Sequence, residues 1–119
     1  MTSRMRLGAL GEDAAARLLE QSGYRILERN YRCRLGEVDL IAEQGALLVF
    51  VEVRTRATAA FGGPAATVTR AKQRKVIAAA RDFLARWRGP ERGVRFDVVS
   101  VVDGPAGPVL EHLPAAFEA

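Results

Sequence analysis

Two carboxylates in neighbouring apolar segments are the residues of this sequence best suited to chemistry. Glu52 interrupts the apolar run LLVFVEV, and Asp39 stands within EVDLIAE. A carboxylate in a buried strand is destabilising unless it is paired or binds a metal. Two carboxylates that share a site repel each other unless a proton or a cation lies between them. Mg²⁺ or Mn²⁺ prefer such oxygen ligands and, with bound water, would support hydrolysis of a phosphodiester.

The spacing of the two segments predicts that these side chains lie together. In a hairpin whose turn has two or four residues, opposed residues have numbers with an odd sum, so Asp39 and Glu52 share one face of the sheet. Positions two residues away share that face, which adds Glu37 and Arg54. A three-residue turn or a bulge would break this parity, so the prediction depends on the turn.

Residue types alone leave two interpretations of this cluster. In the first, Asp39 and Glu52 bind a divalent metal; zinc is disfavoured because Cys33, the single cysteine, lacks the spacing of a zinc site. In the second, Arg54 neutralises Asp39 or Glu52 in an ion-pair cluster that holds no metal. A hairpin with this cluster at one end is expected in both.

The elements that must position these residues follow from hydrophobic periodicity. Apolar side chains at helical spacing predict helices at residues 5–22 and 68–87. Alternating or β-favouring segments predict strands at residues 24–31, 37–43, 46–54 and 94–102, with a weaker edge strand at 109–113. A turn is expected at Gln44-Gly45 and an exposed loop at residues 55–67. The order α-β-β-β-α-β predicts an α/β fold with a mixed sheet flanked by helices.

Composition predicts a single domain over residues 1–119 and an anionic partner. The chain is 49% hydrophobic and 27% charged, which is usual for a globular domain, and it carries a net charge of +4. Sixteen of its eighteen basic residues are arginine, the side chain that binds phosphate with two parallel hydrogen bonds. We therefore expect nucleic acid, DNA first, as the partner. No apolar run predicts a membrane span or a signal peptide, so a cytoplasmic protein is expected.

The second predicted helix carries the densest group of basic side chains. It offers Arg70, Lys72, Arg74 and Lys75 within one and a half turns, beside a loop in which Phe61 could stack on an exposed base. The alternative is that these charges form a solvated helix face with no ligand. Trp87 is expected in the core.

Several segments together resemble the YraN-like uncharacterised protein family over nearly the whole chain. The resemblance is carried by GEVDLI at residues 36–41, FVEVRTR at 50–56, RFDV at 95–98, and by Gly8, Gly11, Glu12, Phe61, Gly62 and Lys72. That family is placed with the PD-(D/E)xK endonuclease-like superfamily, whose closest relatives in architecture are archaeal Holliday-junction resolvases. The resemblance implies a restriction-endonuclease-like core and, because resolvases are dimers, a homodimer.

The resemblance also implies roles for individual residues. Asp39 and Glu52 match the acidic metal ligands, and Glu12 matches an acid that resolvase-like members bring to the metal. Glu37, just before the motif, would support the ligands. Arg54 stands where the superfamily has lysine; since guanidinium stays protonated, Arg54 cannot be a general base and would clamp a phosphate or hold Glu52.

Together the residues and the resemblance imply a divalent-metal-dependent nuclease-like protein acting on DNA or structured nucleic acid. The alternatives are a binding module that keeps the nuclease fold without turnover, and an interaction scaffold with no affinity for nucleic acid. In the first two cases the expected nucleic-acid contacts are Arg54, Arg56, Phe61, Arg70, Lys72, Arg74 and Lys75.

Overall fold

A computed structural model describes residues 4–56 and 68–119. Helix α1 spans Arg4–Gln21 and helix α2 spans Arg70–Arg86. The strands are β1 (Arg25–Cys33), β2 (Gly36–Gln44), β3 (Leu47–Arg56), β4 (Gly93–Gly104) and β5 (Gly107–Phe117). They form one sheet in the order β1-β2-β3-β4-β5. The expected α/β class, the element order and the additional edge strand are confirmed.

The sheet is mixed because of a single crossover. Strands β3 and β4 pair in parallel, and every other neighbouring pair is antiparallel. A parallel pair cannot be joined by a tight turn, and α2 lies in the connection between β3 and β4. Helix α2 therefore follows β3 in the sequence, on the segment that returns the chain to β4.

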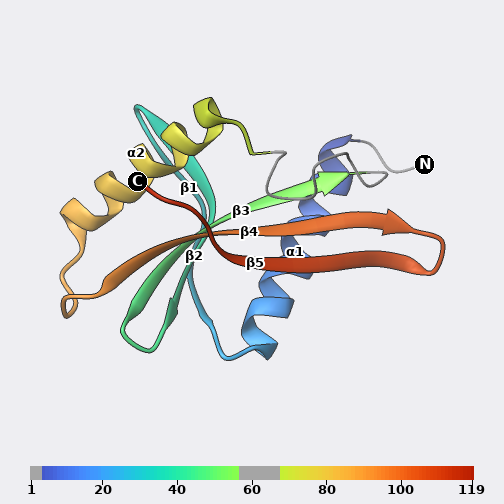
Figure 1. Ribbon diagram of the computed structural model, residues 1–119, viewed down its shortest axis with the longest axis horizontal. Coiled ribbons are helices and arrows are strands. Elements are labelled where there is room, and N and C mark those ends of the chain that lie inside the picture. Colours follow the sequence, from blue (N-terminus) through green and yellow to red (C-terminus); the bar gives the residue numbers. More distant parts are fainter. Residues whose placement is uncertain (1–3, 57–67) are drawn as a thin grey trace.

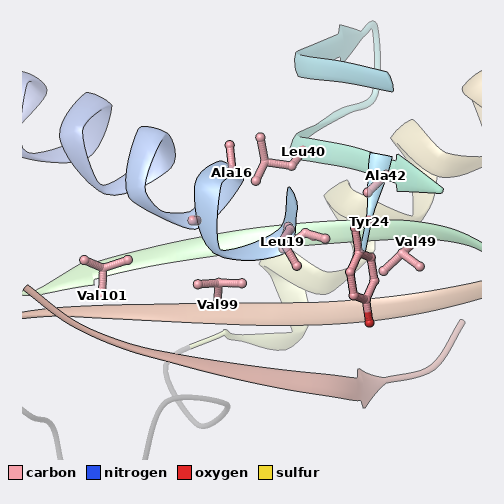
Figure 2. Packing of buried hydrophobic residues seen from close by; sticks show 10 residues of the cluster. Ala16, Leu19, Tyr24, Leu40, Ala42, Val49, Val99 and Val101 are labelled. Atoms are coloured by element: carbon pink, nitrogen blue, oxygen red, sulfur yellow. The ribbon is translucent and has the colours of Figure 1, made fainter. Parts of the chain in front are cut away.

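The two helices cover opposite faces of the sheet (Figure 1). On one face, Val49 and Val51 of β3 pack with Leu19 of α1, in the cluster that Figure 2 shows from close by. On the other face, Leu48 and Phe50 pack with α2. Alternate residues of β3 thus enter different cores, as strand periodicity requires, and the strand is buried on both sides.

The hairpin between β2 and β3 has a two-residue turn. Gln44 pairs with Leu47, so the turn is Gly45-Ala46, one residue later than expected; Gly45 has a positive φ of 55°. The ladder runs to the pair Leu40 and Val51. The predicted parity therefore holds, and the next pair in this register is Asp39 with Glu52.

Several strands are longer than periodicity predicts. Thr55 and Arg56, expected in a loop, continue β3 because they pair with Val101 and Val102 of β4. Strand β5 extends the expected edge strand at both ends. The remainder of the predicted loop, including Phe61, lies outside the described residues. No helix in the described ranges is long and apolar enough to cross a membrane.

Candidate metal centre

A polar cavity of about 260 Å³ lies where the β2–β3 ladder ends. Four elements supply its charged side chains. These are Glu12 of α1, Asp39 of β2, Glu52 and Arg54 of β3, and Lys72 of α2. The structure thus brings the predicted metal ligands Glu12, Asp39 and Glu52 together in one cavity. It also places the ammonium group of Lys72 beside them.

Asp39 joins the two strands at the point where their backbone ladder stops. The backbone N–H of Val53 donates a hydrogen bond to Asp39 Oδ2 over 2.8 Å. A side-chain oxygen therefore binds an amide of the neighbouring strand beyond the last paired residues. This bond holds the carboxylate of Asp39 at the cavity and leaves it further lone pairs for another ligand.

Glu52 is the most unusual group of the cavity. Its side chain is only 2% exposed, and its Oε2 accepts no hydrogen bond from residues 4–56 or 68–119. Burial raises the pKa of Glu52 to about 9, helped by a hydrogen bond with Asp39 and by that residue's negative charge, while Lys72 opposes the shift. At neutral pH the carboxyl group of Glu52 is therefore protonated.

Lys72 is the cation that the structure places against Glu52. Its Nζ lies 3.5 Å from Glu52 Oε2 and 3.6 Å from Glu37 Oε1. Thr69 caps α2 by accepting a hydrogen bond from the backbone N–H of Lys72, which sets the direction of the first turn. The sequence predicted Lys72 as a phosphate contact on a basic helix face, and its place in the acid cluster was missed.

Glu12 approaches the cluster from α1. Partial burial raises its pKa, and the negative charge of Asp39 adds to the shift. Close packing of α1 on β3 depends on Gly11, because a Cβ there would lie 2.2 Å from Thr55 Oγ1. Gly8 lines the cavity, but a Cβ on it would meet nothing within 4 Å, so it is not needed for this approach.

The arginines of β3 form fewer ion pairs and hydrogen bonds than expected. Within the described residues, Arg54 forms no ion pair with Asp39 or Glu52, and its buried Nε has no hydrogen-bond partner. The interpretation in which Arg54 neutralises these acids is therefore wrong; Lys72 occupies that position. Arg56 donates to Ser100 Oγ over 3.3 Å.

Three other predicted nucleic-acid contacts lie on α2 and do not line the cavity. Arg70, Arg74 and Lys75 are exposed on the first two turns of α2. Glu37 forms ion pairs with Lys72 and Arg32, and its supporting role toward the ligands stays a prediction. No set of three histidine, cysteine, aspartate or glutamate side chains in residues 4–56 and 68–119 is already arranged as a metal-binding group.

A second buried acid, Asp97, was not predicted as a site residue. It accepts two hydrogen bonds from Arg95, each 2.8 Å long, a third from Ala115 N, and contacts His112 Nε2 at 2.7 Å. Burial alone would raise the pKa of Asp97, but the bonds to His112 and Arg95 lower it overall. All these partners lie on β4 or β5, so the network anchors the edge strand.

The fold and the cavity define an α/β protein with an acidic pocket at the end of a mixed sheet. The sequence profile of the uncharacterised protein family UPF0102 matches residues 11–101, and the chain belongs to that family. It is 51% identical over 115 residues to a UPF0102 protein of Anaeromyxobacter dehalogenans, covering 97% of this chain and 86% of the relative. It is 52% identical over 102 residues to one of Symbiobacterium thermophilum, covering 86% of each.

Proposed function

We propose that this protein is a divalent-metal-dependent nuclease of the PD-(D/E)xK class that acts on DNA or structured nucleic acid. One observation carries the proposal: Asp39 and Glu52 meet in a cavity at the end of a hairpin, with Lys72 beside them. Paired carboxylates, a nearby ammonium group and a basic surface form the usual set for phosphodiester hydrolysis.

The residues present fit a Mg²⁺ or Mn²⁺ ion. Mg²⁺ is commonly bound by one or two carboxylates and keeps several waters, so a three-residue cage is not required. Glu52 Oε2, which has no hydrogen-bond partner among the described residues, and the proton on Glu52 mark a position where a cation would replace a proton. When bound, the ion would polarise the phosphate and lower the pKa of a water molecule.

The remaining side chains of the cavity then have distinct tasks. Arg54 lines the cavity and has a buried Nε without a described partner, which suits a clamp on a phosphate oxygen. Lys72, held between Glu37 and Glu52, would stabilise negative charge that develops on the phosphate. Glu12, with its raised pKa, would accept a hydrogen bond from the attacking water.

The test is cleavage of branched, single-stranded and duplex DNA with Mn²⁺ or Mg²⁺. Asp39→Asn should abolish cleavage, a loss of at least about a hundredfold, because it removes one of two anionic ligands. Glu20→Gln, on an exposed site of α1, is the matched control and should cleave at the wild-type rate. Equal cleavage by Asp39→Asn and wild type would refute the proposed site.

A binding module without turnover is the second candidate. It is favoured by Arg54 at the position where the superfamily has lysine, and by the lack of a preformed three-acid group within the described ranges. Calorimetry with Mn²⁺ shows whether the ion binds, which the nuclease requires. Cleavage by the metal-bound protein then separates the nuclease from the binding module. If the missing lysine is the defect, Arg54→Lys should raise cleavage above the wild-type level.

A further inference from the structure

The tip of the β1–β2 hairpin carries an exposed apolar side chain next to a basic one. Strand pairing ends at Cys33 and Gly36, so Arg34-Leu35 is the turn. Leu35 is 76% exposed, and the side chain of Arg32 is 74% exposed. Leu35 follows Arg34 directly, so the turn presents an apolar side chain next to a basic one.

The tip is held firmly against α2. A Cβ on Gly36 would lie 1.9 Å from the backbone carbonyl oxygen of Lys75, so only glycine allows this contact. Figure 1 shows the hairpin reaching up beside α2. The turn thus has a defined place on the outer side of that helix, as a recognition element requires.

Two hollows of about 310 and 330 Å³ flank the tip, and both include Arg34 and Leu35. The first also contains Arg32 and Lys75, and the second contains Arg81. We name Arg32, Arg34, Leu35, Lys75 and Arg81 the hairpin-tip surface.

The acidic side chains of the two hollows already form ion pairs with basic side chains. Glu37, in the first hollow, pairs with Arg32 and Lys72. Asp82, in the second, accepts a hydrogen bond from Tyr31 and pairs with Arg86. The hairpin-tip surface therefore keeps an excess of positive charge, which suits an anionic ligand.

Ion pairs link this surface to the acidic cavity. Arg32 Nε lies 3.4 Å from Glu37 Oε2, and Lys72 Nζ lies 3.6 Å from Glu37 Oε1 and 3.5 Å from Glu52 Oε2. A chain of charged contacts thus runs from the tip to the candidate metal ligands. Arg32 and Lys72 are the basic side chains of this chain of contacts, and they lie on either side of Glu37.

We propose that the hairpin-tip surface is a second nucleic-acid contact, which binds the substrate beside the site of cleavage. Arg32, Arg34, Lys75 and Arg81 bind backbone phosphates, and Leu35 packs against a base that is not stacked in a duplex. Arginine suits phosphate because its planar fork matches two oxygens, and apolar wedges of this kind act on unstacked bases in other nucleic-acid complexes. The inference rests on the proposed function, because it extends the same substrate away from the cavity.

The experiment measures binding of labelled branched, single-stranded and duplex DNA at several salt concentrations, with EDTA to prevent cleavage. The double variant Arg34→Ala, Arg81→Ala should bind all three DNAs roughly tenfold more weakly, with the slope of log affinity against log salt reduced by about 2. Leu35→Ser should weaken binding to branched and single-stranded DNA and leave duplex binding unchanged. The matched control is Arg17→Ala on α1, an exposed arginine outside both surfaces, which should bind as wild type.

The outcomes separate this inference from the proposed function. Wild-type affinity and salt slope in the double variant, confirmed as folded by circular dichroism, would overturn the inference even if wild-type protein cleaves DNA. Weaker binding in the variants would uphold the surface even if Asp39→Asn left cleavage unchanged, which would refute the metal site alone. A wild-type protein that binds an acidic peptide but none of the three DNAs would also overturn the inference.

Discussion

At the scale of single residues, the decisive feature is a carboxyl group kept protonated by its surroundings. Glu52 lies in the core with Asp39 as its neighbour, and Lys72 is too distant at 3.5 Å to form a normal hydrogen bond with it. Such an arrangement is costly for stability and is therefore typical of a functional site. The same property makes the folded state sensitive to pH.

The protonation of Glu52 predicts that stability falls as pH rises. Because burial raises the pKa of Glu52 from 4.5 to about 9, the folded state binds more protons than the unfolded state between these values. The free energy of unfolding should therefore decrease from about pH 5 to about pH 9 in metal-free buffer. Urea unfolding at pH 6, 7, 8 and 9 measures this change.

Glu52→Gln is the variant that isolates this effect. The amide keeps the shape of the side chain but cannot ionise, so unfolding of the variant should depend less on pH than that of wild type. Glu111→Gln, on an exposed site of β5, serves as the control and should keep the wild-type pH dependence. A Glu52→Gln profile parallel to that of wild type would contradict the assignment of the proton to Glu52.

At the scale of elements, close packing of the helices on the sheet brings the charged side chains together. α1 approaches β3 at Gly11, and α2 approaches the β1–β2 hairpin at Gly36. Asp97 of β4 holds the edge strand, since its partners His112 and Ala115 lie on β5. These contacts, more than the strands alone, decide where the polar groups lie.

Substitution of Gly36 tests the packing of the hairpin on α2. Gly36→Ala should lower the free energy of unfolding by about 1–3 kcal/mol, because the added methyl group would overlap a backbone carbonyl that cannot move alone. In contrast, Gly8→Ala should raise it by about 0.5–1 kcal/mol, since Gly8 lies in a helix and an added Cβ would meet no described atom within 4 Å. Urea unfolding at one pH compares the two variants.

The Gly36→Ala result also bears on nucleic-acid binding. A displaced hairpin should weaken DNA binding at the hairpin-tip surface, whereas Gly8→Ala leaves that surface unchanged. If Gly36→Ala were as stable as wild type, the close approach of the hairpin to α2 would be incorrect.

At the scale of the whole molecule, charge is distributed unevenly between site and surface. The chain carries a net charge of +4, yet three acids line the cavity. A basic protein that concentrates carboxylates at one position is suited to hold a cation there and a polyanion around it. Binding of the cation should then stabilise the entire fold.

Thermal unfolding with Mn²⁺ or Mg²⁺ measures this stabilisation. A ligand that binds the folded state alone adds about 2.7 kcal/mol at a concentration of 100 Kd. The wild-type midpoint should therefore rise with metal concentration, and the rise should be larger at pH 8 than at pH 6 because metal and proton compete at Glu52. Asp39→Asn should lose the rise; Glu20→Gln, the control, should keep it. An equal rise in both variants would mean that the ion binds elsewhere.

Much of this architecture follows from local patterns in the sequence. Helical and strand periodicities predicted the order of elements, and the parity of a tight hairpin predicted that Asp39 and Glu52 share a position. Errors occurred at element ends, such as Thr55 and Arg56, where pairing with β4 extends a strand beyond its apolar pattern. These predictions succeed because period and turn length are properties of neighbouring residues.

The sequence by itself thus determined the α/β order and the facing of the two carboxylates, and only the tertiary structure decided what surrounds them. Lys72 contacts Glu52 because the crossover helix α2 returns across the sheet, and Leu35 lies near Arg81 because Gly36 lets the hairpin meet that helix. The raised pKa of Glu52 likewise comes from burial by several elements at once. Contacts between residues distant in sequence depend on how helices pack on the sheet, which no local pattern records.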